Sequence, residues 1–136
     1  MPPELRRIVA IEAHRRRSGR CPTVVHSLGN GETFAVLPMP DGFVDLASGL
    51  RAQAEADRLL LPGDRGPIAL SLAEGDDITF AGIDLATGAR FTGRAGGGSS
   101  VTLFDGPLEN YVQYAVGYGN PDAPEEAGSG VAATAT

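Results

Sequence analysis

The chain has 136 residues, of which 42% are hydrophobic and 21% are charged, and its formal net charge at pH 7 is −6. This composition is typical of one soluble globular domain, and the 19 glycines and 10 prolines indicate many turns rather than long helices. All eleven basic residues are arginine, which excludes a P-loop and a Schiff-base site, because both need a lysine.

The basic residues are concentrated at the start of the chain. Residues 1–20 hold six arginines and two acids, whereas the remainder is strongly acidic. An acidic surface repels polyanions, so we expect neither a nucleic acid nor a membrane as the main partner. Four arginines are candidates for a local anion or partner site, although a solvated turn is the simpler interpretation. These four are Arg15, Arg16, Arg17 and Arg20.

A first hairpin is predicted over residues 8–28. Residues 8–14 alternate weakly between apolar and polar side chains, and residues 23–28 are rich in β-branched ones, with the arginine-rich turn between them. The Gly-Asn-Gly sequence at residues 29–31 is a strong reversal signal that leads into a strand over residues 33–37. The chain is therefore expected to begin with antiparallel strands.

Two near-copies of one segment indicate a repeated hairpin turn. Residues 44–49 read Val-Asp-Leu-Ala-Ser-Gly, and residues 83–88 read Ile-Asp-Leu-Ala-Thr-Gly. Asp and Ser or Thr side chains can bond the local backbone, and Gly supplies the positive φ that a strand reversal needs. Asp45 and Asp84 occupy matching positions and suggest a carboxylate pair for acid–base chemistry, but turn formation accounts for them better.

The segment after the first copy, residues 50–61, has two interpretations. Its Ala, Gln, Glu and Arg content favours a helix, whereas its strict alternation of small apolar and polar residues favours a strand, which we adopt. Further strands are predicted on either side of a turn at residues 74–77. A glycine-rich linker is expected at residues 96–100, and a final hairpin turns at residues 105–110.

Short strands at this spacing predict an all-β fold, a small antiparallel meander that closes into a barrel or sandwich. We expect a single all-β domain over residues 1–116. Residues 117–136 are rich in Gly, Pro, Ala, Ser and Glu without periodicity, which is typical of a flexible tail.

Most of the aromatic residues lie in the last hairpin and the strand before it. They form either part of the core or an exposed stacking face for a sugar or a protein. The candidates for ligand or partner binding are Phe91, Phe104, Tyr111 and Tyr114.

His14, Cys21 and His26 have side chains that can bind metals and would approach one another in the predicted first hairpin. Their spacing matches no common zinc pattern, so ordinary packing is the simpler interpretation, and we predict no cofactor. Cys21 is the single cysteine, which precludes an intramolecular disulfide and fits a reducing compartment. The N-terminal apolar stretch is too short for a signal peptide or a membrane span, so a cytoplasmic location is expected.

The sequence contains no complete catalytic set. We therefore expect a non-enzymatic bacterial accessory or assembly module that binds another protein or its own copies, with opposed charges that allow head-to-tail docking. The alternative is a barrel that binds a small ligand or glycan in an aromatic-lined mouth. A metal-dependent enzyme centred on His14 and His26 is the third hypothesis.

Overall fold

The computed structural model describes residues 1–73, 78–96 and 98–119. These residues form one helix, α1 (Pro3–Ser18), and ten strands. The strands are β1 (Val24–Ser27), β2 (Thr33–Met39), β3 (Gly42–Asp45), β4 (Leu50–Glu55), β5 (Arg58–Leu60), β6 (Ile68–Leu72), β7 (Thr79–Asp84), β8 (Ala89–Ala95), β9 (Ser100–Asp105) and β10 (Asn110–Gly117).

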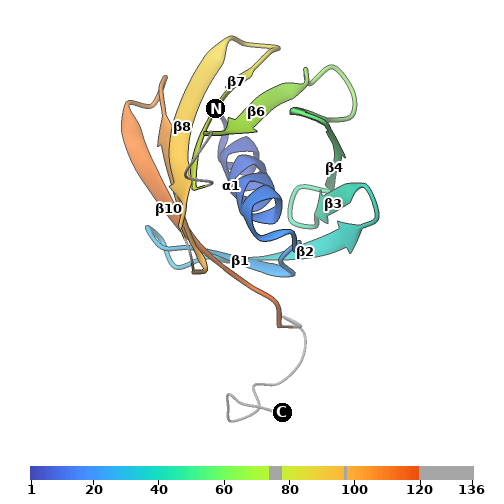
Figure 1. Ribbon diagram of the computed structural model, residues 1–136, viewed down its shortest axis with the longest axis vertical. Coiled ribbons are helices and arrows are strands. Elements are labelled where there is room, and N and C mark those ends of the chain that lie inside the picture. Colours follow the sequence, from blue (N-terminus) through green and yellow to red (C-terminus); the bar gives the residue numbers. More distant parts are fainter. Residues whose placement is uncertain (74–77, 97, 120–136) are drawn as a thin grey trace.

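The strands form a closed barrel around α1 (Figure 1). Each strand pairs antiparallel with the next one in the sequence, and β1 pairs with β10 to close the ring. Val24 lies opposite Gly117 at this seam. The predicted all-β antiparallel meander is therefore confirmed, and its closed form is a barrel.

The N-terminal segment differs from the prediction. Residues 8–14 are not a strand, and Arg15, Arg16 and Arg17 are not in a hairpin turn, because both segments belong to α1, which ends just before Arg20. The barrel wall encloses this helix on all sides, so apolar residues occur around its whole circumference and no helical periodicity marks them. Six of its apolar side chains are at most 4% exposed: Leu5, Ile8, Val9, Ala10, Ile11 and Ala13.

The ends of α1 follow ordinary sequence rules. Pro3 stands at the first helical position, where its missing N–H removes no helical hydrogen bond. Gly19 ends the helix in the left-handed conformation, with φ at 76°, and its N–H donates to the carbonyl of Arg15 over 2.8 Å. Proline and glycine were thus the local signals for this helix.

The remaining predicted strands agree with the structure where it describes them. The segment over residues 50–61 is extended, as predicted, and a tight turn at residues 56–57 divides it into β4 and β5. The predicted turn at residues 74–77 lies outside the described residues, as do Gly97 of the predicted linker and residues 120–136 of the predicted tail. Gly117, the first residue of that tail, ends β10.

Two phenylalanines pack across neighbouring strands onto glycines. Phe80 of β7 lies opposite Gly93 of β8, and Phe91 of β8 lies opposite Gly82 of β7. The two rings contact each other with centroids 6.3 Å apart, and both are almost fully buried. A Cβ atom on Gly93 would lie 2.4 Å from Cζ of Phe80 and 2.3 Å from the carbonyl oxygen of Thr102. These glycines therefore leave the space that the rings occupy.

We predict that Gly93→Ala lowers the free energy of unfolding by about 2 kcal/mol, because the added methyl group overpacks the wall between the ring of Phe80 and the backbone. Chemical denaturation measures the change. Gly29→Ala is the control, since no atom lies within 4 Å of the added Cβ there. Equal stability of the two variants would contradict this account of the wall.

Candidate functional site

The two ends of the barrel carry different side chains. In a meander, alternate hairpins turn at the same end, so the turns after β1, β3, β5, β7 and β9 lie together. Four of these turns, those after β1, β3, β7 and β9, each expose a leucine to about half of its full extent. We call this the leucine end, defined by Leu28 (54% exposed), Leu46 (50%), Leu85 (47%) and Leu108 (47%). The other is the arginine end, where α1 terminates in Arg15, Arg16 and Arg17.

Three turns at the leucine end share the same hydrogen bond, from the backbone N–H of one residue to the carbonyl of an aspartate four positions earlier. Two of these turns were recognisable in the sequence as near-copies. The carbonyl oxygens of Asp45 and Asp84 accept hydrogen bonds from Gly49 and Gly88, each 2.7 Å long, and both glycines have positive φ. The prediction that these segments form turns is confirmed. In the third turn, Asp105 accepts the same bond from Glu109, which has a φ of 57°.

The carboxylates of these turns are buried, and two of them hold α1 in place. Asp45 accepts two hydrogen bonds from Arg7, from Nε at 2.9 Å and from Nη2 at 2.6 Å. The Ser48 hydroxyl donates to the same carboxylate over 2.6 Å. Asp105 pairs with Arg6 at 3.3 Å. Because a buried charge is costly unless it is paired, these contacts set the position of the helix within the barrel.

We predict that Asp45→Asn lowers the free energy of unfolding by roughly 3–5 kcal/mol, because it leaves the buried Arg7 without its counter-charge. Chemical denaturation again provides the measurement. The control is Asp41→Asn, which removes an exposed pair with Arg51 and is expected to cost less than about 1 kcal/mol. A loss at Asp45 as small as that at Asp41 would show that the buried pair does not anchor α1.

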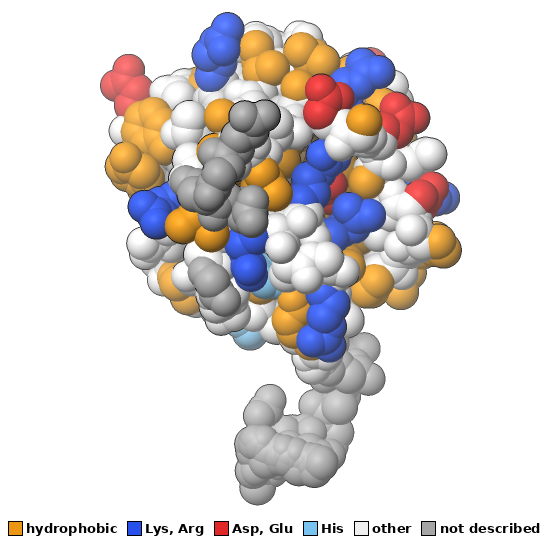
Figure 2. All heavy atoms as spheres, viewed as in Figure 1, with side chains coloured by type: hydrophobic (Ala, Val, Ile, Leu, Met, Phe, Trp, Pro, Cys, Tyr) orange, Lys and Arg blue, Asp and Glu red, His pale blue; other side chains and the backbone are white. Residues whose placement is uncertain are grey.

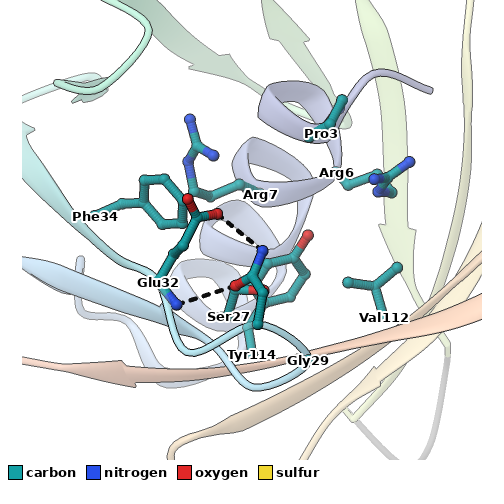
Figure 3. A pocket seen from close by; sticks show the side chains of 10 residues that line it. Pro3, Arg6, Arg7, Ser27, Gly29, Glu32, Phe34, Val112 and Tyr114 are labelled. Carbon is teal, nitrogen blue, oxygen red and sulfur yellow. Dashed lines mark hydrogen bonds between the residues drawn. The ribbon is translucent and has the colours of Figure 1, made fainter.

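A cavity of about 310 Å³ opens beside the first turns of α1 at the leucine end (Figure 3). The helix, the β1–β2 hairpin and β10 form its walls. Arg6 and Arg7 project from α1 on different sides, Arg7 toward Phe34 and Arg6 toward the side of Val112. The full set of lining residues is Pro3, Arg6, Arg7, Ser27, Gly29, Asn30, Glu32, Phe34, Val112 and Tyr114.

The polar groups of this cavity are only partly engaged. The guanidinium of Arg7 lies 3.9 Å above the ring of Phe34, and its hydrogen bonds to Asp45 use Nε and Nη2. Nε of Arg6 is buried and has no hydrogen-bond partner among the described residues. Burial raises the pKa of Tyr114 above its ordinary value of 10, so its hydroxyl keeps its proton at neutral pH. The cavity therefore offers hydrogen-bond donors.

A second, more open hollow of about 390 Å³ lies at the same end of the barrel. The start of the chain and the turns after β7 and β9 line it, mostly with apolar atoms. Its residues are Met1, Pro2, Thr87, Gly88, Ala89 and Pro107. The hollow extends the apolar surface between the tips that carry Leu85 and Leu108.

The first two arginines of the predicted anion site are engaged with their own chain. Arg15 and Arg16 both pair with the buried Glu12, at 3.3 and 2.5 Å. Burial raises the pKa of Glu12, and the two guanidinium groups oppose that shift. Nη2 of Arg16 also donates to the carbonyls of Glu55 and Arg58, at 2.9 and 3.1 Å. Arg16 thus fastens the end of α1 to the β4–β5 turn.

The other two arginines of that prediction also contact the chain. Arg17 donates to the carbonyl of Gly98 over 3.2 Å, and the guanidinium of Arg20 lies 3.8 Å above the ring of Tyr118. The face drawn in Figure 2 carries several arginine side chains close to one another. Contacts with carbonyls and with an aromatic ring leave less of these guanidinium groups available to a partner.

The structure separates the four predicted aromatic residues. Phe91 is 2% exposed and belongs to the core, whereas Tyr114 lines the cavity beside α1. Phe104 and Tyr111 pair edge to face on the outer wall, with centroids 5.0 Å apart. Tyr111 is 65% exposed, so this pair presents a ring to solvent, as the stacking interpretation requires.

The predicted metal ligands have different partners. His14 lies within α1, and its Nε2 forms a hydrogen bond with the Tyr118 hydroxyl. Nδ1 of His26 lies 2.9 Å from the hydroxyl of Thr33. Burial raises the pKa of Cys21 to about 11, which leaves its thiol protonated and unreactive. Within residues 1–73, 78–96 and 98–119, no three His, Cys, Asp or Glu side chains are grouped closely enough to hold a metal ion.

His14 makes stability depend on pH. The residue is 2% exposed, and its Nδ1 has no hydrogen-bond partner in the described part of the chain. Burial lowers the pKa of His14 from 6.5, and the positive charge of Arg17 lowers it further. Below pH 6.5 the imidazole of the unfolded chain takes up a proton that the folded chain does not, so stability falls with pH until the folded imidazole is also protonated.

We therefore predict that the free energy of unfolding decreases between pH 7 and pH 5, with a contribution from His14 of at most about 1.4 kcal/mol per pH unit. Denaturation at several pH values measures the slope. His14→Gln is expected to flatten it, whereas His26→Gln, on the β1 strand, serves as the control that retains it. An unchanged slope in the His14 variant would contradict this assignment.

Comparison with protein-family models, curated proteins and solved structures finds no match to this chain. Within the described residues, no helix combines the length and the apolar character that crossing a membrane requires.

Sequence reasoning missed Arg6, Arg7 and the exposed leucines. The two arginines precede the region that was interpreted as a strand, so nothing indicated that they enter the barrel. The leucines carried a signal, however. Leu46 and Leu85 stand at the same position in the two copies of the turn, directly after the aspartate. A turn needs no apolar side chain there, so this repetition pointed to a shared surface.

Proposed function

We propose that this barrel is a non-enzymatic module that binds another protein, or a second copy of itself, through its leucine end. The observation that carries the proposal is the presence of a half-exposed leucine on each of four hairpin tips at one end of the barrel. Single exposed leucines are common on protein surfaces, but several at one end of a domain, two of them on tips that border an apolar hollow, are typical of an interaction site.

The closed barrel restricts where a partner can attach. Every strand has two neighbours, so the wall offers no free edge for the addition of another strand. The arginine end is less suited to docking than the sequence suggested, because Arg15, Arg16 and Arg17 bind groups of their own chain. Both facts support the leucine end over the head-to-tail charge contact expected from the sequence.

The burial of α1 also affects the alternative function, a barrel that holds a small ligand. A ligand cannot occupy the barrel axis, because the helix fills it. The cavity beside Arg6 and Arg7 is the observation that favours ligand binding, and it lies between the helix and the barrel wall rather than on the barrel axis.

We predict that the double variant Leu46→Ser/Leu85→Ser loses association that the unchanged protein shows. The matched control is Leu37→Ser/Tyr111→Ser, which removes two apolar side chains that are at least as exposed (48% and 65%) from the outer wall and is expected to retain association. Light scattering after size-exclusion chromatography over a range of protein concentrations tests self-association. Affinity capture from cells that express the chain, with all three proteins as bait, tests for another partner.

The proposal expects one of two results. In the first, the unchanged protein and the control form oligomers and the leucine variant does not. In the second, the unchanged protein and the control capture a protein that the leucine variant does not capture. The proposal is wrong if the unchanged protein is monomeric at every concentration and all three baits capture the same proteins.

A further inference from the structure

The cavity beside α1 has charged walls of both signs, and of the four leucine tips only the one that carries Leu28 contributes to it. At about 310 Å³, it lies at the lower end of the range of roughly 300–1,000 Å³ that is usual for small-molecule sites. None of Leu46, Leu85 and Leu108 lines it. The cavity can therefore be altered without altering the tips that carry Leu46, Leu85 and Leu108.

The helix supplies a positively charged wall. Arg7 lines the cavity with its Nη1 free of hydrogen bonds to described residues, while Asp45 and the ring of Phe34 hold the rest of the guanidinium in place. Arg6 stands one position earlier and is tied to Asp105 through Nη1. Arg6 lies beside the neutral hydroxyl of Tyr114, and these two groups together form a favourable environment for a carboxylate, with the charge of Arg7 adding to the positive potential of the wall.

The β1–β2 hairpin supplies an acidic group on the opposite side. Glu32 lines the cavity, and the Asn30 amide holds its Oε1 at 2.8 Å, while the Glu32 backbone N–H donates back to Asn30 over 3.0 Å. Oε2 of Glu32 has no donor among the described residues, so it can accept one from a ligand. Figure 3 shows this carboxylate beside Phe34, facing the helix that carries the arginines.

Apolar groups complete the walls. Phe34 and Val112 face the cavity from β2 and β10, and Pro3 faces it from the start of α1. A ligand that matches all of these surfaces has a carboxylate, a positively charged donor group and an apolar body. A simple anion satisfies only the arginines and is repelled by Glu32.

We propose that this cavity binds a small zwitterion of the amino-acid type. Its carboxylate lies against Arg6 and Tyr114, its ammonium group donates to Glu32 on the other side of the cavity, and its apolar side chain packs on Phe34 and Val112. The complementary charges on the two walls fix the orientation of the ligand and distinguish it from a molecule that carries only one of the two groups.

Three related probes test this assignment on the full chain: L-phenylalanine, 3-phenylpropanoate, which lacks the ammonium group, and 2-phenylethylamine, which lacks the carboxylate. Titrations followed by ¹H–¹⁵N NMR give the affinity and locate the site. We expect saturable binding of L-phenylalanine, with the largest shifts at residues 27–34 and 112–114, and at least tenfold weaker binding of the other two probes.

Two glutamate variants separate the cavity from the general surface charge. Glu32→Gln is expected to weaken L-phenylalanine binding at least fivefold and to leave 3-phenylpropanoate binding no weaker. Glu32 is exposed, so the variant is expected to fold. Glu109→Gln removes an exposed carboxylate from another tip at the same end and is expected to change neither affinity.

The zwitterion site is wrong if L-phenylalanine does not bind saturably to the unchanged protein, if 3-phenylpropanoate binds equally well, or if Glu32→Gln has no effect. The double variant Leu46→Ser/Leu85→Ser is expected to keep its affinity for L-phenylalanine. Failure of the ligand site and failure of the protein-docking proposal are therefore distinguishable in the same set of proteins.

Discussion

The buried ion pair between Arg7 and Asp45 joins the helix that fills the barrel to the turn that shapes its rim. The carboxylate of Asp45 also accepts the Ser48 hydroxyl, so one side chain takes part both in the turn and in the docking of α1. The guanidinium that it holds is in turn stacked on Phe34, which forms a wall of the cavity. Turn geometry, helix position and cavity shape therefore depend on the same contact, and each constrains the others.

A helix inside a small barrel changes what such a fold can do. Barrels of this size often keep an interior volume for a ligand, but here apolar side chains of α1 occupy it. The surfaces that remain for recognition are the rims and the wall. At the leucine end, the exposed tips, the apolar hollow and the charged cavity lie close to one another, whereas at the arginine end the charged side chains mainly bind the chain itself.

The sequence predicted those parts of the structure that depend on residues close together in the chain, and it missed those that depend on contacts between distant segments. The strands and turns were predictable because an aspartate, a hydroxyl residue and a glycine within five positions determine a turn without reference to distant residues. Helix α1 was missed because its environment is not local: the barrel surrounds it, so it has no polar face, and the weak alternation of residues 8–14 resembled a strand. The cavity was unpredictable for the same reason, since it combines Arg7, Glu32 and Tyr114 from three separate elements.

The closure of the barrel has a consequence for folding. The seam joins Val24 to Gly117, so the ring is completed only when nearly the whole described chain has been synthesised and the most distant strands meet. Helix α1 precedes the first of these strands and ends up enclosed, which means that it leaves the ribosome before the strands that must assemble around it. Until the last strand arrives, its apolar surface stays open to water on at least one side, so the nascent chain is expected to depend on rapid completion, or on a chaperone, to avoid aggregation.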